Sequence, residues 1–323
     1  MTSSLRLSWL QKLVYGSGDW GISSYITFRQ IFYAIFLTDV VGLPPWQASL
    51  AMFLGILWDA INDPLVGRLS DRVNLTWGRR SFLAIFALPF GLGFLLHWWS
   101  PPWSSSALRT LSVALALMIS DTFQTLVSVP YHAMLPEIAP GYHERTSLSG
   151  FRMVFNLAAS VATAVIAPEI IAWVSHTGGG VQQGYWIAAA LLGVMAALPF
   201  MLIALLVPQP AVRSRLAPRT FSFSRSITLA WRNIPFRLAT LLYVLNWITV
   251  DLLAMMLPFV LVYYVAQGDR LAKVKFFDLR LTLESAAMGI LLVTALLAIP
   301  FWAWLAKKVG KIRAYLAAIS FWI

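Results

Sequence analysis

Runs of about twenty apolar residues recur along this chain, and they constrain its fold more than any other feature. A helix of about that length crosses the roughly 30 Å hydrocarbon core of a bilayer. The chain has 323 residues, of which 59% are hydrophobic and 11% charged, and its mean hydropathy is +0.73. Soluble domains are far less apolar and carry about 25% charged residues. The sequence therefore predicts an all-α polytopic membrane protein.

The apolar runs divide the chain into two unequal parts. Eight complete runs cover residues 20–41, 46–67, 81–100, 107–128, 149–174, 184–207, 236–264 and 284–306, and a ninth begins near residue 312. The first is too long for a signal-peptide core, so we expect it to be retained. A polar, proline- and arginine-rich segment follows the sixth run. These features predict a six-helix amino-terminal lobe (1–207), a basic cytoplasmic linker (208–235) and a partial carboxy-terminal lobe (236–323).

The positive charge of the chain lies mainly in alternate loops. The formal net charge is +11, and no cysteine is present to form a disulfide or a thiolate metal site. The amino terminus and the even-numbered loops hold 17 lysines and arginines, whereas the opposite loops hold five. Loops rich in positive charge face the cytoplasm. The distribution predicts a multi-pass protein of the cell inner membrane with a cytoplasmic amino terminus, and it argues against a nucleic-acid partner.

Several tryptophans lie near the ends of the predicted spans. They are Trp46, Trp98, Trp99, Trp103 and Trp186. Indole rings prefer the level of the lipid headgroups. We therefore expect these side chains to anchor the protein in the lipid bilayer rather than to form a ligand cage.

Two aspartates lie inside the second apolar run, in the segment WDAINDPLVGRLSDR (58–72). Asp59 and Asp63 are four residues apart, so they share one face of a helix. A carboxylate at the centre of a spanning helix costs about 2.5–3.5 kcal/mol, and two of them repel each other. Two hard oxygen ligands suit Na⁺, or a proton held by one carboxyl group. Alternatively, each aspartate pairs with an arginine of a neighbouring helix and only stabilises the bundle.

Three more charged residues, Arg29, Asp121 and Arg152, fall at a similar estimated depth inside predicted spans. An isolated arginine in hydrocarbon is unfavourable, so Arg29 needs a partner, for which Asp121 is a candidate. A structural pair and a contact with substrate are equally good interpretations of these two residues. Arg152 could complement the two aspartates of the second run or bind a substrate anion.

Two polar residues near span ends have simple interpretations. Asp19 follows two glycines where the first run begins, and a carboxylate at the start of a helix is favourable there. His132 lies where the fourth run ends, and it could be either solvated or a ligand. The sequence has no HExxH, GxSxG or phosphate-loop pattern.

The basic loop after the second run has a mechanical interpretation. Gly67 is expected to allow close approach of two helices, and Asp71 to pair with arginines nearby. Such a cluster can hold one conformation of a rocking transporter and release it in another. The candidate switch residues are Gly67, Asp71, Arg72, Gly78, Arg79 and Arg80. A solvated loop that only orients the protein is the alternative.

Several segments in colinear order resemble one known family. They are YGSGDWG (15–21), FLTDVVGLPPWQA (36–48), WDAINDPLVGRLSDR with GRR (58–80), VPYHAMLPEIAPGYHERTSLSGFRMVFN (129–156) and the turn at 304–313. The family is the glycoside–pentoside–hexuronide:cation symporters of the major facilitator superfamily, typified by melibiose permease. The resemblance implies two six-helix lobes that work by alternating access. Compared with that two-lobe architecture, we expect the chain to be C-terminally truncated, with a complete first lobe and about two and a half helices of the second.

The resemblance implies a cation site in this chain. The family's two cation-coordinating aspartates match Asp59 and Asp63, which would bind Na⁺ if the protein is Na⁺-coupled. A functional arginine of the fifth helix matches Arg152.

The positions that the family uses for sugar differ here. Its two sugar-binding aspartates fall on Ser23 and Ser128, and a tryptophan that follows the second falls on His132. The same two spans carry Arg29 and Asp121 instead.

The sequence thus predicts a secondary active symporter, coupled to Na⁺ or H⁺, of a sugar, a glycoside or another small organic solute. We expect no enzyme activity and no cofactor besides the coupling ion. One alternative is a non-transporting remnant or partner subunit, with the missing C-terminal helices supplied as a separate fragment. A minor alternative is an intramembrane transferase that binds Mg²⁺ and diphosphate, which would need a second acidic cluster opposite the first.

Overall fold

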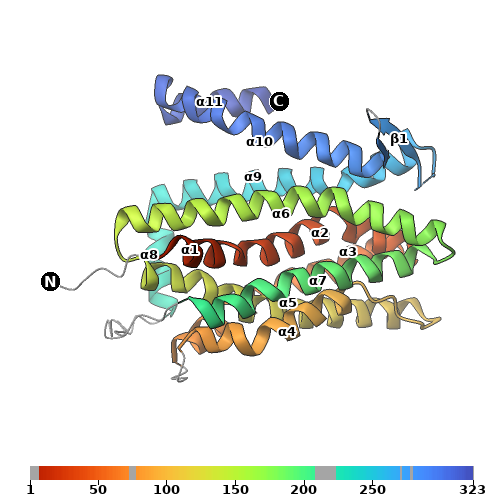
Figure 1. Cartoon of the computed structure of the whole chain (residues 1–323), viewed down its shortest axis with the longest axis horizontal. Helices are drawn as coiled ribbons and strands as arrows, with labels where there is room; N and C mark the ends of the chain where they lie inside the picture. The colour runs from red at the N-terminus through yellow and green to blue at the C-terminus, as the bar shows by residue number, and fades with distance from the viewer. Residues whose placement is uncertain (1–6, 73–77, 208–222, 270, 277–278, 323) are drawn as a thin grey trace.

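The computed structural model of the chain is built almost entirely of helices (Figure 1). It describes residues 7–72, 78–207, 223–269, 271–276 and 279–322. The helices are α1 (Trp9–Gly16), α2 (Gly18–Asp39), α3 (Pro45–Arg72), α4 (Arg80–His97), α5 (Ser106–Ile138), α6 (Tyr142–His176), α7 (Val181–Leu206), α8 (Phe223–Arg232), α9 (Ile234–Phe259), α10 (Leu283–Val309) and α11 (Lys311–Trp322). A π-helical turn (Val260–Val265) extends α9, and strands β1 (Lys273–Phe276) and β2 (Leu279–Thr282) form an antiparallel hairpin.

Each predicted span corresponds to a helix of the structure, from α2 for the first run to α11 for the ninth. Seven described helices are long and apolar enough to cross a membrane: α3, α4, α5, α6, α7, α9 with its π-helical extension, and α10. Helices α5 and α6 continue past their apolar runs, because polar residues prolong a helix beyond the hydrocarbon. The sequence analysis missed α1 and the hairpin, which are too short to produce a hydropathy signal.

The predicted linker over 208–235 is partly helical. Residues 208–222 lie outside the described residues. Helix α8 occupies Phe223–Arg232, and α9 begins at Ile234 with the side chain of Asn233 accepting a hydrogen bond from the backbone N–H of Phe236. The second half of the proposed linker is therefore an ordered helical connection.

Helix α2 lies in the middle of the bundle. It contacts α6, α7 and α9, and Figure 1 shows it between α6 and α7. Most of its residues are buried, including Asp19 and Ser23. The polar side chains of this helix therefore face other helices, and this position lets them find partners within the protein.

Helices approach most closely where glycines face each other or an apolar side chain. A Cβ on Gly193 of α7 would lie 2.6 Å from the carbonyl oxygen of Gly91 on α4, so these helices cross backbone against backbone. The prediction that Gly67 serves this purpose is wrong, because a Cβ there would meet only ordinary contact at 3.9 Å. On α3 the tight position is Gly55, where a Cβ would lie 1.9 Å from Leu117.

An aromatic cluster fills the core beside α2. Trp98 is 1% exposed, and its ring lies 3.9 Å from that of Phe28 and 5.1 Å from that of Tyr185, centroid to centroid. The prediction that Trp98 is an interfacial anchor is therefore wrong. A tryptophan at the end of an apolar run can be either an interfacial anchor or a core residue, and only tertiary packing distinguishes these two roles. Trp46 and Trp186 are 66% and 47% exposed, as an anchor requires.

The carboxy-terminal elements contact the first six spans mainly at one end. The hydroxyl of Tyr263 donates to Asp39 at 2.6 Å, and the backbone N–H of Thr282 donates to Glu169 at 2.6 Å. Both contacts lie at the ends of α2 and α6 that are distant from the basic loops. Helix α10 packs on α6 near its own start and then leaves the bundle toward α11 (Figure 1).

Candidate cation site and neighbouring ion pairs

Asp59 and Asp63 lie on α3 beside α5 and α2. Asp63 is exposed, and its Oδ1 accepts a hydrogen bond from Thr125 Oγ1 at 3.0 Å. Asp59 is 30% exposed at its side chain, and its Oδ2 lies 3.9 Å from Arg29 Nη1, which is beyond hydrogen-bond distance. Its Oδ1 is buried without a hydrogen-bond partner among the described residues. The two carboxylates therefore keep oxygens that are not engaged by a fixed basic side chain.

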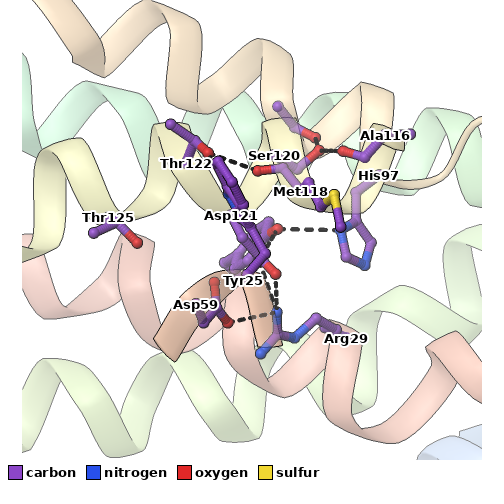
Figure 2. Close-up of polar contacts among 12 residues, drawn as sticks. Tyr25, Arg29, Asp59, His97, Ala116, Met118, Ser120, Asp121, Thr122 and Thr125 are labelled. Carbon is purple, nitrogen blue, oxygen red and sulfur yellow. Dashed lines mark hydrogen bonds and ion pairs between the residues drawn. The ribbon is translucent and has the colours of Figure 1, made fainter. Parts of the chain in front are cut away.

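The predicted pairing of Arg29 with Asp121 is present (Figure 2). Arg29 Nη1 lies 2.7 Å from both carboxylate oxygens of Asp121, whose side chain is 2% exposed. The hydroxyl of Tyr25 donates to Asp121 Oδ1 at 2.8 Å and lies 3.1 Å from His97 Nδ1. The single Tyr25 proton is used at Asp121, so His97 donates from Nδ1 to the tyrosine oxygen. The pair is thus part of a buried network across α2, α4 and α5.

Arg152 does not complement the two aspartates of α3. Its Nε lies 2.5 Å from Asp19 Oδ2 and its Nη2 lies 3.2 Å from Oδ1. The Tyr131 hydroxyl lies 3.2 Å from Asp19 and shares its one proton with the nearer carbonyl oxygen of Tyr15 at 2.9 Å. Asp19 is 5% exposed. The interpretation of Asp19 as a simple start-of-helix carboxylate is therefore wrong. The sequence did hold a signal, because an arginine inside a span requires an acidic partner, and the same reasoning identified the Arg29 pair.

The Asp19–Arg152 pair is one rung of a polar ladder between α2 and α6. Its three rungs are Asp19–Arg152, Ser23–Asn156 and Thr27–Ser160. The partners in each rung are 133 residues apart, so the two helices run parallel and in register with a period of four. The α2 members are buried, and the α6 members are partly exposed. The ladder therefore presents hydroxyl, amide and guanidinium groups along one seam.

The other predicted substrate positions lie near this ladder. His132 is 47% exposed at its side chain, and its Nε2 lies 4.0 Å from Asp19 Oδ1. Ser128 is buried on α5, one helical turn before His132. The structure therefore gathers Ser23, His132 and Arg152 around Asp19.

The basic loop between α3 and α4 includes the expected ion pair. Arg79 Nη2 lies 2.7 Å from Asp71 Oδ1, and Arg79 Nε lies 2.9 Å from Glu137 on α5. Asp71 is 64% exposed at its side chain. These contacts connect the ends of α3, α4 and α5 at one side of the bundle.

The remaining candidate switch residues flank that ion pair. Arg80 donates from Nη1 to the backbone carbonyl of Val207 at the end of α7. Gly78 has a φ of +56°, a conformation that favours glycine, so it permits the turn into α4. The side chain of Arg72 lies outside the described residues.

The alternative of a magnesium–diphosphate enzyme requires two facing acidic clusters. Within the described residues, no group of three histidine, cysteine or acidic side chains is placed to hold a metal ion. Asp121 is an acid that acts on Asp59 from another helix, and Arg29 already occupies both of its oxygens.

Comparison with known proteins gives a consistent result. Residues 14–323 match the model of a family described as MFS/sugar transport protein. An uncharacterized symporter, sll1374, of Synechocystis is 31% identical over 231 residues, which are 67% of this chain and 42% of that protein. The inner membrane symporter YicJ of Escherichia coli is 28% identical over 247 residues (76% and 52%). The sodium-dependent lysophosphatidylcholine symporter 1 of Gallus gallus is 26% identical over 350 residues (98% and 63%). The chain thus spans about half the length of the curated relatives it matches.

Proposed function

The chain belongs to the MFS/sugar transport protein family and is a multi-pass membrane protein of the glycoside–pentoside–hexuronide:cation symporter group, and from this premise we propose that it couples the movement of a small organic solute to that of Na⁺ or H⁺. The carboxylates of Asp59 and Asp63 bind the coupling ion. The protein works by alternating access in the cell inner membrane, with the basic loops in the cytoplasm.

The observation that carries this proposal is the incomplete neutralisation of the α3 pair. Asp59 has a buried oxygen without a hydrogen-bond partner among the described residues, and the hydrogen bond that Asp63 accepts comes from the neutral hydroxyl of Thr125. Two carboxylates one turn apart repel each other, and a monovalent cation between them removes that repulsion. Thr125 Oγ1 keeps lone pairs after donating to Asp63, so it supplies a third oxygen ligand of the kind Na⁺ prefers.

The α2–α6 ladder is the proposed surface for the solute. Its serine, threonine and asparagine side chains can exchange hydrogen bonds with the hydroxyl groups of a sugar or glycoside. The family description names sugar transport, and that chemistry suits these side chains. A relative that is named for lysophosphatidylcholine makes a polar headgroup the second substrate class to test, with Arg152 as a ligand for its phosphate.

Sodium-dependent thermal stability of the purified chain tests the cation site. A ligand at a hundred times its Kd stabilises the folded state by about 2.7 kcal/mol. We expect NaCl, compared with choline chloride, or acidification in the absence of Na⁺, to raise the Tm of the wild type. Asp59→Asn and Asp63→Asn should abolish that rise. Asp269→Asn is the matched control, since Asp269 is an exposed acid in the α9–α10 connection.

Uptake measurements complete the test. Proteoliposomes that contain the chain should accumulate labelled sugars, glycosides or lysophospholipids faster when a cation gradient is imposed. Equal cation responses in the wild type and in both asparagine variants would overturn the assignment of the cation site. A wild type whose stability responds to neither Na⁺ nor protons would overturn cation coupling itself.

A further inference from the structure

Arg29 lies between two carboxylates, Asp59 and Asp121, of which only Asp59 is assigned to the cation site in the proposed function. Figure 2 shows its guanidinium group between Asp121 of α5 and Asp59 of α3. Both hydrogen bonds to Asp121 leave from Nη1, and the same atom lies 3.9 Å from Asp59 Oδ2. A movement of about 1 Å would bring this atom to hydrogen-bond distance of Asp59. The guanidinium group of Arg29 is thus within reach of Asp59, one of the two carboxylates proposed to bind the coupling cation.

Asp121 is held more firmly than Asp59. Its carboxylate accepts hydrogen bonds from Arg29 and from Tyr25, which are one helical turn apart on α2. Its side chain is 2% exposed, whereas the Asp59 side chain is 30% exposed. The stronger, less solvated partner therefore retains the guanidinium group, and the position of Arg29 is decided by the competition between these two acids.

The charge of Arg29 acts directly on the cation site. A positive group 3.9 Å from Asp59 repels any cation that binds this carboxylate, and an opposite charge on Asp121 offsets that repulsion. In the part of the chain that the structure describes, the charged groups that face Asp59 are Arg29 from α2, Asp121 from α5 and Asp63 from its own helix. A change in either member of the pair should therefore change the affinity for the cation without altering any direct ligand.

We propose that Arg29 and Asp121 are positioning residues that set the affinity of the Asp59–Asp63 pair for the coupling cation, with Asp121 holding the Arg29 guanidinium group away from Asp59. This inference rests on the proposed function. It assigns to the pair a role beyond stabilising the bundle, and it requires no contact between the pair and the solute.

The two single substitutions should have effects of opposite sign. Asp121→Asn frees the guanidinium group to bind Asp59, where it competes with the external cation, so we expect the half-saturating cation concentration to rise about tenfold. Arg29→Gln removes the competing charge, so that concentration should fall. In the double variant the two changes should largely cancel, and Arg29→Lys, which keeps the charge, should remain near the wild type.

The experiment titrates the purified full chain with the cation and measures Tm. NaCl is the probe at constant ionic strength with choline chloride, and a proton titration without Na⁺ is the second arm. The half-saturating concentration is compared among the wild type, Asp121→Asn, Arg29→Gln, the double variant and Arg29→Lys. The double variant is informative even if a single variant unfolds, because it leaves no unpaired buried charge.

The outcomes separate the two proposals. Either of two results supports the inference. In the first, the half-saturating cation concentration shifts in opposite directions in Asp121→Asn and Arg29→Gln. In the second, it rises in Asp121→Asn and stays near the wild-type value in both the double variant and Arg29→Lys. Single variants that lower Tm without changing the half-saturating concentration show that the pair is only structural and overturn it, although the cation site stands. A wild type that responds to neither cation overturns the proposed function and the inference together.

Discussion

The carboxylates of α2 and α3 have opposite surroundings although both lie in an apolar bundle. Asp19 is 5% exposed, receives two hydrogen bonds from Arg152 and lies 3.2 Å from the Tyr131 hydroxyl. Asp59 and Asp63 are more exposed, and the guanidinium group that lies 3.9 Å from Asp59 is bound to another acid. A buried acid with a complete set of donors is stable only while its partners stay in place. An acid with incomplete partners can accept a mobile cation.

The difference separates two roles that the sequence presents in the same form. An aspartate inside a spanning helix can neutralise a fixed arginine, or it can bind an ion that comes and goes. Loss of one partner from the first kind leaves an uncompensated charge. Loss of a carboxylate from the second kind removes a ligand and a repulsion at once. Substitutions at the two places should therefore differ in both the size and the kind of their effects.

The largest effect is expected at the Asp19–Arg152 pair. Asp19→Asn leaves Arg152 without its carboxylate partner, and loss of one partner from a buried ion pair costs about 3–5 kcal/mol. Thermal unfolding of the purified chain should show a marked fall in Tm, without a change in the cation concentration that gives half of the stabilisation.

The matched control for that variant is Asp71→Asn. Asp71 also pairs with an arginine, but it is 64% exposed, and Arg79 keeps its contact with Glu137. An exposed pair contributes about 0–1 kcal/mol. Equal losses of stability in the two variants would contradict the contrast between buried and exposed acids.

A smaller effect is expected at Tyr25. Tyr25→Phe removes a donor to the buried Asp121 carboxylate, and a hydrogen bond to a charged group contributes about 1.5–3 kcal/mol. Tyr33→Phe is the matched control on the same helix, because the buried Tyr33 hydroxyl has no hydrogen-bond partner among the described residues. The Tm should fall for the first variant and stay level or rise for the second. A similar fall in both would show that the ring packing, and not the hydrogen bond, determines stability.

The sequence predicted the helices and the Arg29–Asp121 pair, because both follow from the cost of polar groups in hydrocarbon. Helix-face spacing also placed Asp59 and Asp63 together. The partner of Arg152 was missed, since Asp19 lies at a helix start where a free carboxylate is equally reasonable. Trp98 and Gly67 were misassigned for a related reason. Interior packing and helix crossing depend on contacts between distant segments, which spacing along one helix does not reveal.

The next prediction concerns Thr125, the hydroxyl partner of Asp63. Thr125→Val keeps the shape of the side chain and removes both its hydrogen bond to Asp63 and the oxygen proposed as a third ligand of the cation. We expect the half-saturating cation concentration to rise by about five- to tenfold. Thr122→Val is the control, since Thr122 binds Trp58 and lies one turn earlier on α5. A change in cation affinity in the control variant but not in Thr125→Val would contradict the proposed geometry.

The smallest effect is expected at Asp59 when no coupling cation is added. Asp59→Asn removes the repulsion from Asp63 but also a weak attraction to Arg29 across 3.9 Å. These terms oppose each other, so the stability of the cation-free protein at alkaline pH should change by less than about 1 kcal/mol, in either direction. The measurement is thermal unfolding of both proteins in choline chloride. A loss as large as that of Asp19→Asn would show that Asp59 belongs to the same class as Asp19, a fixed structural acid, because a mobile cation cannot stabilise a protein from which it has been withheld.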